Sequence, residues 1–372
     1  MQSDVIVIGA GTVGAAIAYG LARKKLRVEL LDGDDGDFRA ARANFGLVWL
    51  QGKGINMPAY QAWTGSSVDL YPEFNKELAA LTRMDIQYER NGGLQFCFGE
   101  EEFENRRLHL QRLHNQLGAA ERHWEMLDRT ELEKLLPKVP LGPDVAGASF
   151  GRRDGHANPL KLLAALLAGF QRLGGTLRTR ARVQNILPGK GSFTVNFGDE
   201  QIMAPRLVIA AGLGTVALAS QVGLEIPLRP QRGQILVTER FAPFLPLPSS
   251  GFRQTSDGTV MIGATQEEVG FDTSTTNTAA HTLAKKMVRL VPALASATLV
   301  RHWAGLRVMT PDSYPIYAQS EAWPGAFVAL CHSGVTLAAA HAVRVADAIA
   351  AGALPESLDV FHQRRFDVPK AA

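Results

Sequence analysis

The sequence predicts an α/β protein whose N-terminal part is a Rossmann-like dinucleotide-binding unit, and three features support this prediction. Val5–Ile8 is an apolar run too short for a helix, which is typical of a strand buried on both faces. Three glycines follow with the spacing G-x-G-x-x-G, namely Gly9, Gly11 and Gly14. A second predicted strand, Arg27–Leu31, ends at Asp32, whose carboxylate can accept hydrogen bonds from both ribose hydroxyls of a dinucleotide.

Each glycine of this fingerprint has its own physical role. Gly9 permits the tight turn after the strand, Gly11 lets a pyrophosphate approach the backbone, and Gly14 lets the next helix pack against the strand. That helix is expected over residues 15–23, and its N-terminus offers free amide hydrogens that attract a phosphate. The acidic residue after the second strand would repel a 2′-phosphate, so NADP is disfavoured, while NAD and FAD both remain open.

The composition limits the class of protein. The 372 residues are 46% apolar, which is enough for a sizeable core and for two domains. A net charge of +3, with no basic run interleaved with aromatics, argues against a nucleic-acid partner. Cys97 and Cys331 lie far apart and outside any metal-ligand spacing, so we expect no disulfide framework, iron–sulfur site or metal. With no signal peptide or transmembrane helix evident, we expect a cytoplasmic protein.

Helical spacing of apolar residues and helix-forming composition predict further helices. The longer ones are expected at 57–81, 100–118, 160–173, 277–291 and within 326–348. A short helix at 130–136 has two alternative capping boxes, Thr130 with Glu133 or Asp128 with Glu131. A linker follows it, marked by Pro137, Pro140 and Pro143.

Apolar runs and turn residues predict the remaining strands. We expect a strand, turn and strand over 87–98 around Gly92 and Gly93, and one strand over 176–187. Hairpins are expected at 193–203 and 251–265, and a buried strand with a small-residue turn at 206–214. In that last turn, missing side chains would allow the backbone to approach a cofactor.

Two segments carry a resemblance to a known family. Residues 39–54, RAARANFGLVWLQGKG, resemble the D-amino-acid oxidase superfamily of flavoproteins, and in particular catalytic subunits of opine oxidase, hydrogen cyanide synthase and D-hydroxyproline dehydrogenase. Residues 301–317 contain the superfamily pattern W-x-G-L-R-x-x-T-P-D-x-x-P-I, and 230–238 match P-x-R-G-Q-x-x-x-T. The resemblance covers almost the whole chain and is weakest over 91–145.

The resemblance implies FAD as the cofactor. It implies a Rossmann-like FAD-binding domain of the glutathione-reductase type, formed by 1–84, 146–222 and 302–372, and a second α+β substrate domain built on an antiparallel sheet, formed by 85–145 and 223–301. Besides the fingerprint glycines, Thr12, Val13 and Asp32, the implied FAD contacts are Arg42, Asn44, Phe45, Gly46, Leu47, Val183, Ala211, Gly212, Gly305, Gly334, Val335 and Thr336.

The resemblance also implies the substrate contacts. Arg307 inherits the arginine that binds the substrate carboxylate, and a planar guanidinium can indeed hold a carboxylate by two hydrogen bonds. Arg253 and Met261 are candidate pocket residues on the predicted hairpin, although an exposed arginine and a core methionine are equally good interpretations. His332 can face the flavin or anchor its own loop.

The implied activity is FAD-dependent oxidation of the C–N bond of an amino or imino acid by hydride transfer. A D-hydroxyproline or D-proline-like imino acid is favoured narrowly over an opine such as octopine or nopaline, and glycine, sarcosine and D-amino acids are further alternatives. Two other classes stay open, an NAD-dependent dehydrogenase and a noncatalytic flavoprotein subunit of an electron-transfer complex.

The resembling subunits also imply partners. We expect a second flavoprotein subunit and a small iron–sulfur subunit, because this chain has no cysteine set for an electron relay. Association with the inner membrane would then be peripheral and would run through such a complex. The sequence does not separate oxygen from a quinone or dye as the electron acceptor.

Overall fold

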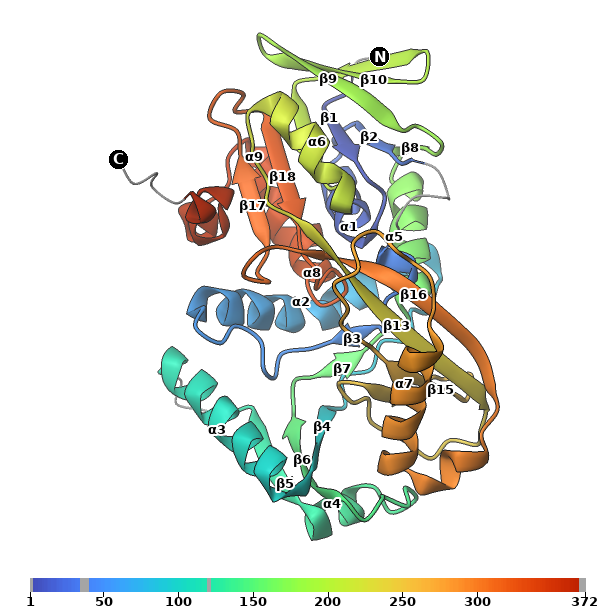
Figure 1. The fold of residues 1–372 in the computed structure, drawn as a ribbon. Helices are drawn as coiled ribbons and strands as arrows, with labels where there is room; N and C mark the ends of the chain where they lie inside the picture. Colours follow the sequence, from blue (N-terminus) through green and yellow to red (C-terminus); the bar gives the residue numbers. More distant parts are fainter. Residues whose placement is uncertain (1–2, 34–39, 119–121, 368–372) are drawn as a thin grey trace.

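A computed structural model describes residues 3–33, 40–118 and 122–367 of the chain. Its centre is a six-stranded sheet in the upper part of Figure 1. The strand order is β17 (Ile316–Gln319), β18 (Ala326–Leu330), β12 (Arg206–Ile209), β1 (Val5–Ile8), β2 (Val28–Leu31) and β8 (Thr176–Arg178). All neighbours pair in parallel except β17 and β18, as expected of a dinucleotide-binding sheet with an antiparallel edge strand.

Alternate residues of β1 face two separate cores. Val5 and Val7 pack with α1 (Thr12–Arg23), α5 (Pro159–Arg172) and the C-terminal helical segment. That segment consists of α8 (Ala338–Ala340), a π turn at His341–Val345 and α9 (Ala346–Ala351). Ile6 and Ile8 face the other core, which is shared with a three-stranded sheet of β9 (Val183–Gly189), β10 (Ser192–Phe197) and β11 (Glu200–Ala204).

A second layer lies below the central sheet in Figure 1. Its larger sheet has the order β14 (Phe252–Gln254), β15 (Thr259–Gly263), β13 (Arg229–Arg240) and β16 (Leu299–Met309). Its smaller sheet has the order β4 (Gly93–Phe98), β6 (Val145–Gly151) and β5 (Trp124–Asp128). One apolar core joins both sheets to α4 (Arg129–Leu135) and α7 (Asn277–Leu290). The helix α3 (Gly99–Leu117) packs against β4 and β6 in this layer, whereas α2 (Pro58–Thr82) packs against α5 and α8 in the first core.

Two strand predictions were wrong in detail. The segment 176–187 forms two strands in different sheets, β8 and β9, because the chain turns at Arg180, which adopts a left-handed conformation (φ 58°). In 87–98 only β4 is a strand, whereas Glu89 makes a single bridge to His156 of β7 (Gly155–His156). Of the two alternative capping boxes, Asp128 with Glu131 is the one that forms.

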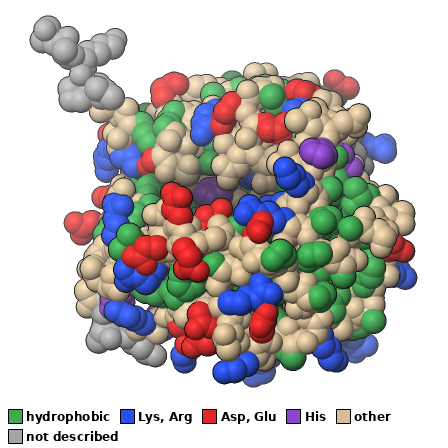
Figure 2. Space-filling model, turned by 60° about the horizontal axis from the view of Figure 1, so that its bottom comes forward, with side chains coloured by type: hydrophobic (Ala, Val, Ile, Leu, Met, Phe, Trp, Pro, Cys, Tyr) green, Lys and Arg blue, Asp and Glu red, His purple; other side chains and the backbone are tan. Residues whose placement is uncertain are grey.

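The predicted domain limits at 146 and 302 both fall inside strands of the second layer. β6 pairs with β4 from Val145 to Gly151 and with β5 from Gly147 to Gly151, and β16 pairs with β13 from Leu299 to Met309. In the described ranges, no helix combines the length and apolar character needed to cross a membrane. On the face drawn in Figure 2, acidic and basic side chains are interspersed, in keeping with the small net charge.

Candidate active site

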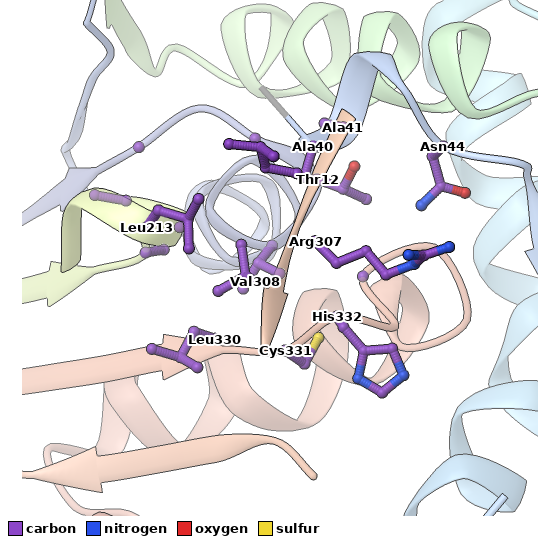
Figure 3. A pocket seen from close by; sticks show the side chains of 18 of the residues that line it. Thr12, Ala40, Ala41, Asn44, Leu213, Arg307, Val308, Leu330, Cys331 and His332 are labelled. Atoms are coloured by element: carbon purple, nitrogen blue, oxygen red, sulfur yellow. The ribbon is translucent and has the colours of Figure 1, made fainter. Parts of the chain in front are cut away.

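A cavity of about 820 Å³ opens at the carboxyl end of the parallel strands. It gathers residues from Ile8 to Thr336, including the fingerprint, the loop after β2, the turn after β12 and the loop after β18. All the implied FAD contacts line it except Gly14 and Gly46. Parallel strands direct their carboxyl ends to one edge of the sheet, so segments far apart in sequence meet there (Figure 3).

The first turn of the fingerprint is shaped to hold a phosphate group. Gly9 has a φ of 102°, and a Cβ there would lie 2.4 Å from the Ala210 carbonyl oxygen. A Cβ on Gly11 would instead point into open space, with nothing within 4 Å. The Thr12 hydroxyl is buried and has no hydrogen-bond partner among the described residues. An open backbone, a helix start and an unpaired hydroxyl together fit the pyrophosphate of a dinucleotide.

Gly14 and Gly46 act through packing. A Cβ on Gly14 would lie 1.9 Å from the Gly9 carbonyl oxygen, so only glycine lets α1 pack this closely against the turn. Gly46 has a φ of 89°, and a Cβ there would lie 2.4 Å from the Ala157 carbonyl oxygen. Both glycines shape the cavity from behind its wall.

The strand β3 (Leu47–Val48) is fixed to the loop after β18. The Thr336 hydroxyl donates to the Leu47 carbonyl at 3.1 Å and accepts from the Trp49 amide at 3.2 Å. The Asn44 side chain accepts a hydrogen bond from the Gly46 amide at 2.7 Å, which holds the turn before β3. These contacts join two walls of the cavity into one unit.

At the other end of the fingerprint, Asp32 follows β2 and lines the cavity. Its carboxylate accepts a hydrogen bond from the Ala10 amide at 3.2 Å. Val183 begins β9 and lines the same cavity, as do Ala211 and Gly212 after β12. The residues present therefore fit an FAD, with its ribose toward Asp32 and its pyrophosphate at the start of α1.

Arg307 extends from β16 into the cavity (Figure 3). Its guanidinium donates to the Thr265 carbonyl at 2.9 Å and, more weakly, to Gln231 and the Arg232 carbonyl at 3.4 Å. All these partners are neutral. A Cβ on Gly233 would lie 2.7 Å from the guanidinium, so the glycine of the R-G-Q motif provides the room that Arg307 occupies. Burial lowers the pKa of Arg307, with Glu267 acting in the opposite direction.

His332 lies beside Arg307 in the cavity (Figure 3). Burial, with the added repulsion of Lys53 and Arg307, lowers the pKa of His332 to about 3. Its Nε2 lies 3.2 Å from the Ser333 hydroxyl. The imidazole is therefore neutral at physiological pH, able to form hydrogen bonds and too weak a base to take a proton from an amine.

Arg253 and Met261 do not line this cavity. Both are buried, and the Arg253 guanidinium contacts the His156 ring at 3.0 Å and the Met261 sulfur at 3.4 Å. The Arg253 guanidinium also lies over the Phe45 ring, 5.7 Å from its centre, and Phe45 itself lines the cavity. In this structure Arg253 and Met261 therefore support the wall from behind rather than face a substrate.

Two further residues of the cavity wall, Lys53 and Ser333, were not among the predicted site residues. The Lys53 ammonium donates to the Ser333 hydroxyl at 3.0 Å, and the Tyr60 hydroxyl donates to the same oxygen at 3.0 Å. The available signal was a lysine between two glycines in the segment that carries the family resemblance. Burial lowers the pKa of Lys53 to about 8.

Cys331 lines the cavity but is a poor nucleophile. Burial raises the pKa of its thiol to about 12, so the thiolate is scarce at neutral pH. The described residues also contain no cluster of His, Cys, Asp and Glu side chains that could hold a metal ion.

Comparison with known proteins places this site in context. The family described as FAD dependent oxidoreductase (DAO) matches residues 4–348. A subunit of opine oxidase from Rhizobium meliloti is 42% identical over 371 residues, covering 100% of this chain and 99% of that protein. The HcnC subunit of hydrogen cyanide synthase from Pseudomonas protegens is 29% identical, covering 98% and 96%. Glycine oxidase from Geobacillus kaustophilus has a similar structure, with a TM-score of 0.88 at 25% identity, covering 99% and 100%.

Proposed function

This chain belongs to the DAO family of FAD-dependent oxidoreductases, binds FAD and oxidises the C–N bond of an amino acid, and we propose that its substrate is an opine. An opine is a secondary amine whose nitrogen joins two carbon atoms that each bear a carboxylate. The observation that carries the proposal is the Arg307 guanidinium, which enters the cavity with neutral partners alone among the described residues. The 42% identity to an opine oxidase subunit supports the opine over other amino acids.

The chain's own residues position the substrate. Arg307 can hold one carboxylate by two hydrogen bonds, which fixes the neighbouring α-carbon and the nitrogen in the cavity. Neutral His332 adds no positive charge beside the substrate, and its Nε2 accepts from the Ser333 hydroxyl, which itself accepts from Lys53 and Tyr60. Since His332 is too weak a base, the amine has to react in its unprotonated form. When bound, FAD supplies the two-electron acceptor that C–N oxidation requires.

The test is an anaerobic absorbance titration of the FAD-loaded chain. Octopine, nopaline, D-hydroxyproline, D-proline, sarcosine and glycine are added separately, and bleaching near ~450 nm reports reduction of the cofactor. Bleaching by octopine or nopaline at the lowest concentration supports the opine. Preferential bleaching by D-hydroxyproline would replace it with the cyclic imino acid, which is the second candidate. A flavin that none of them bleaches would contradict the proposal and favour a noncatalytic subunit.

We propose further that the chain works within a heteromeric complex in the cytoplasm. Two relatives are named as subunits of larger enzymes, which supports this proposal. A second flavoprotein and a small iron–sulfur subunit would carry electrons onward, and any membrane contact would run through them. Co-expression with candidate partners, followed by size-exclusion chromatography and a quinone-reduction assay, tests the assembly. Rapid reoxidation of the isolated chain by oxygen would instead indicate an oxidase that needs no partner.

A further inference from the structure

Lys53 is a cation that the proposed function does not yet use. Its ammonium carries up to three hydrogen-bond donors, yet its hydrogen-bond partner among the described side chains is the Ser333 hydroxyl alone. Among the described residues, no carboxylate lies within ion-pair distance of Lys53 or of Arg307, although both line the same cavity. Against the effect of burial, the carboxylates of Asp154 and Glu267 raise the pKa of Lys53 and Arg307, respectively, from beyond ion-pair distance. Buried charges in proteins are normally paired, so two cations in one cavity without an ion-paired carboxylate indicate a ligand that supplies anions.

The segment that carries Lys53 is firmly held from both sides. Gly52 and Gly54 take left-handed conformations, with φ values of 84° and 80°, which turn the chain so that Lys53 faces the cavity. Just before them, the Gln51 amide donates to the Asp154 carboxylate at 3.2 Å, and the Gln51 side chain donates to the Gly93 carbonyl at 2.9 Å. The lysine is thus placed by buried hydrogen bonds, unlike a mobile surface lysine.

The hydrogen bonds that hold the Lys53 segment extend into the second layer. The Arg106 guanidinium donates to the Gln51 side chain at 2.9 Å and to the Ser149 hydroxyl at 2.9 Å. The Ser149 hydroxyl donates to the same Gln51 oxygen at 2.6 Å. These contacts connect the Lys53 segment to α3 and β6, so the lysine has a fixed place relative to the substrate side of the cavity.

Lys53 and Arg307 act on the same end of the cavity. Both cations repel a proton from His332, and the Lys53 ammonium contacts Ser333 directly after it. A ligand beside His332 can therefore meet both cations. A secondary amine with a single carboxylate would satisfy Arg307 and leave Lys53 unpaired.

We propose that Lys53 binds the second carboxylate of a secondary-amine substrate that carries two, while Arg307 binds the first. The proposal rests on the proposed function and adds its specificity-determining residue. It assigns the substrate class as secondary amines with two carboxylate-bearing arms, in which the central nitrogen lies between the two cations.

The test uses two probes that cannot be oxidised at nitrogen, because sulfur replaces it. Thiodiglycolate has two carboxylates and methylthioacetate has one, and their binding to the FAD-loaded chain is followed by the change in flavin absorbance. The variants are Lys53→Met and Lys53→Arg. The matched control is Lys76→Met, since Lys76 is an exposed lysine of α2 whose side chain is 78% exposed.

We expect the Lys53→Met variant to weaken thiodiglycolate binding about 10- to 100-fold, with the methylthioacetate Kd changed by no more than about twofold. Lys53→Arg should keep most of the preference, and Lys76→Met should match the wild type. Equal losses for both probes, or none, would overturn the proposal. If Lys53→Met fails to retain FAD, the binding of the two probes is compared in Lys53→Gln instead, and the same outcomes apply.

The binding role of Lys53 and the proposed oxidation of an opine can be tested separately. If no amine bleaches the flavin while thiodiglycolate still binds through Lys53, the proposed reaction is wrong and the dicarboxylate site stands. If octopine bleaches the flavin equally well in wild type and Lys53→Met, the reaction stands and Lys53 does not select its substrate.

Discussion

Arg307 is the side chain on which substrate binding depends most directly. Replacing it with methionine removes the guanidinium, and the substrate carboxylate then loses its charged partner. We expect the substrate Kd to rise at least ~100-fold, which corresponds to about 3 kcal/mol. Arg307→Lys keeps the charge without the planar pair of donors and should lose less, about 10-fold. Rapid-mixing reduction of the flavin at several substrate concentrations gives both values, and an unchanged Kd in the methionine variant would remove Arg307 from the site.

We expect the binding of a dicarboxylate to depend on pH because the Lys53 ammonium loses its charge at high pH. Its pKa in the free protein is lowered to about 8, so the ammonium is charged below that pH and neutral above it. Between pH 7.5 and 9.5, binding of thiodiglycolate should therefore weaken by up to about 10-fold per pH unit above 8, whereas binding of methylthioacetate should stay nearly flat. Neither probe has an amine that titrates, so the difference reports on the protein.

The other groups near Lys53 keep their charge in that range. His332 and Cys331 stay neutral, because burial lowers the pKa of the first to about 3 and raises that of the second to about 12. Tyr60 stays neutral because burial raises its pKa well above the range, and Arg307 stays charged. Asp154 is the exception, because burial raises its pKa to about 7, so it is partly protonated at pH 7.5 and becomes fully ionised as the pH rises. If the Kd of thiodiglycolate rises with pH as steeply in Lys53→Arg as in the wild type, the pH dependence belongs to another group.

At this scale, sequence reasoning found residues that belong to motifs and missed those defined by tertiary contact. Arg307 and the fingerprint glycines stand in patterns with a known physical purpose. Lys53 gains its meaning from Ser333, a contact across 280 positions that no local pattern encodes. Arg253 lies on the expected hairpin, but the alternation of a strand cannot reveal that Phe45 would lie between it and the cavity.

At the scale of elements, the turn from β1 into α1 offers a matched pair of glycine substitutions. Gly11→Ala should fold normally, because Gly11 has a φ of −70° and its added Cβ meets no protein atom within 4 Å. That Cβ enters the phosphate side of the cavity, so FAD affinity should fall about 10-fold or more. Gly14→Ala should instead destabilise the fold by about 1–3 kcal/mol, because its Cβ would overlap the Gly9 carbonyl.

Chemical denaturation of the apoproteins and fluorescence titration with FAD separate these two effects. The interpretation fails if Gly11→Ala binds FAD as the wild type does, or if Gly14→Ala is as stable as the wild type.

Periodicity located most elements to within a residue or two. The β1 strand and the hairpin of β14 and β15 are where the pattern predicts them, whereas α1 begins at Thr12, before the predicted Ala15. The break between β8 and β9 was missed because Arg180 takes a left-handed turn that normally favours glycine or asparagine. The π turn at His341–Val345 was missed as well, since its composition is that of an ordinary alanine-rich helix.

At the scale of the whole molecule, FAD should contribute substantially to stability. The cavity is lined by residues from Ile8 to Thr336, so an unfolded chain has no site for FAD. Saturation at ~1,000 times Kd should stabilise the folded state by about 4 kcal/mol. Thermal melts with and without added FAD test this, and Gly11→Ala, melted in parallel, should show a much smaller shift. An equal Tm with and without FAD would contradict the expected coupling.

The overall architecture was predictable because each half has a local signature, whereas the limits between the two domains stay a prediction. The fingerprint fixes a parallel sheet, and the family pattern implies the antiparallel second layer. The predicted limits at 146 and 302 cut through β6 and β16, since strand pairing between distant segments decides where a layer ends. β13 and β16 run side by side across the molecule, so no loop marks a boundary there (Figure 1).

The burial of both cysteines has a practical consequence. Burial raises the pKa of Cys97 to about 11 and that of Cys331 to about 12, so neither sulfur should react readily with a maleimide in the folded protein. The natural chain is thus already suited to site-directed labelling. A single cysteine introduced at an exposed position such as Lys76 would carry a fluorophore or spin label alone, and its distance to a partner protein could then be measured without first removing native thiols.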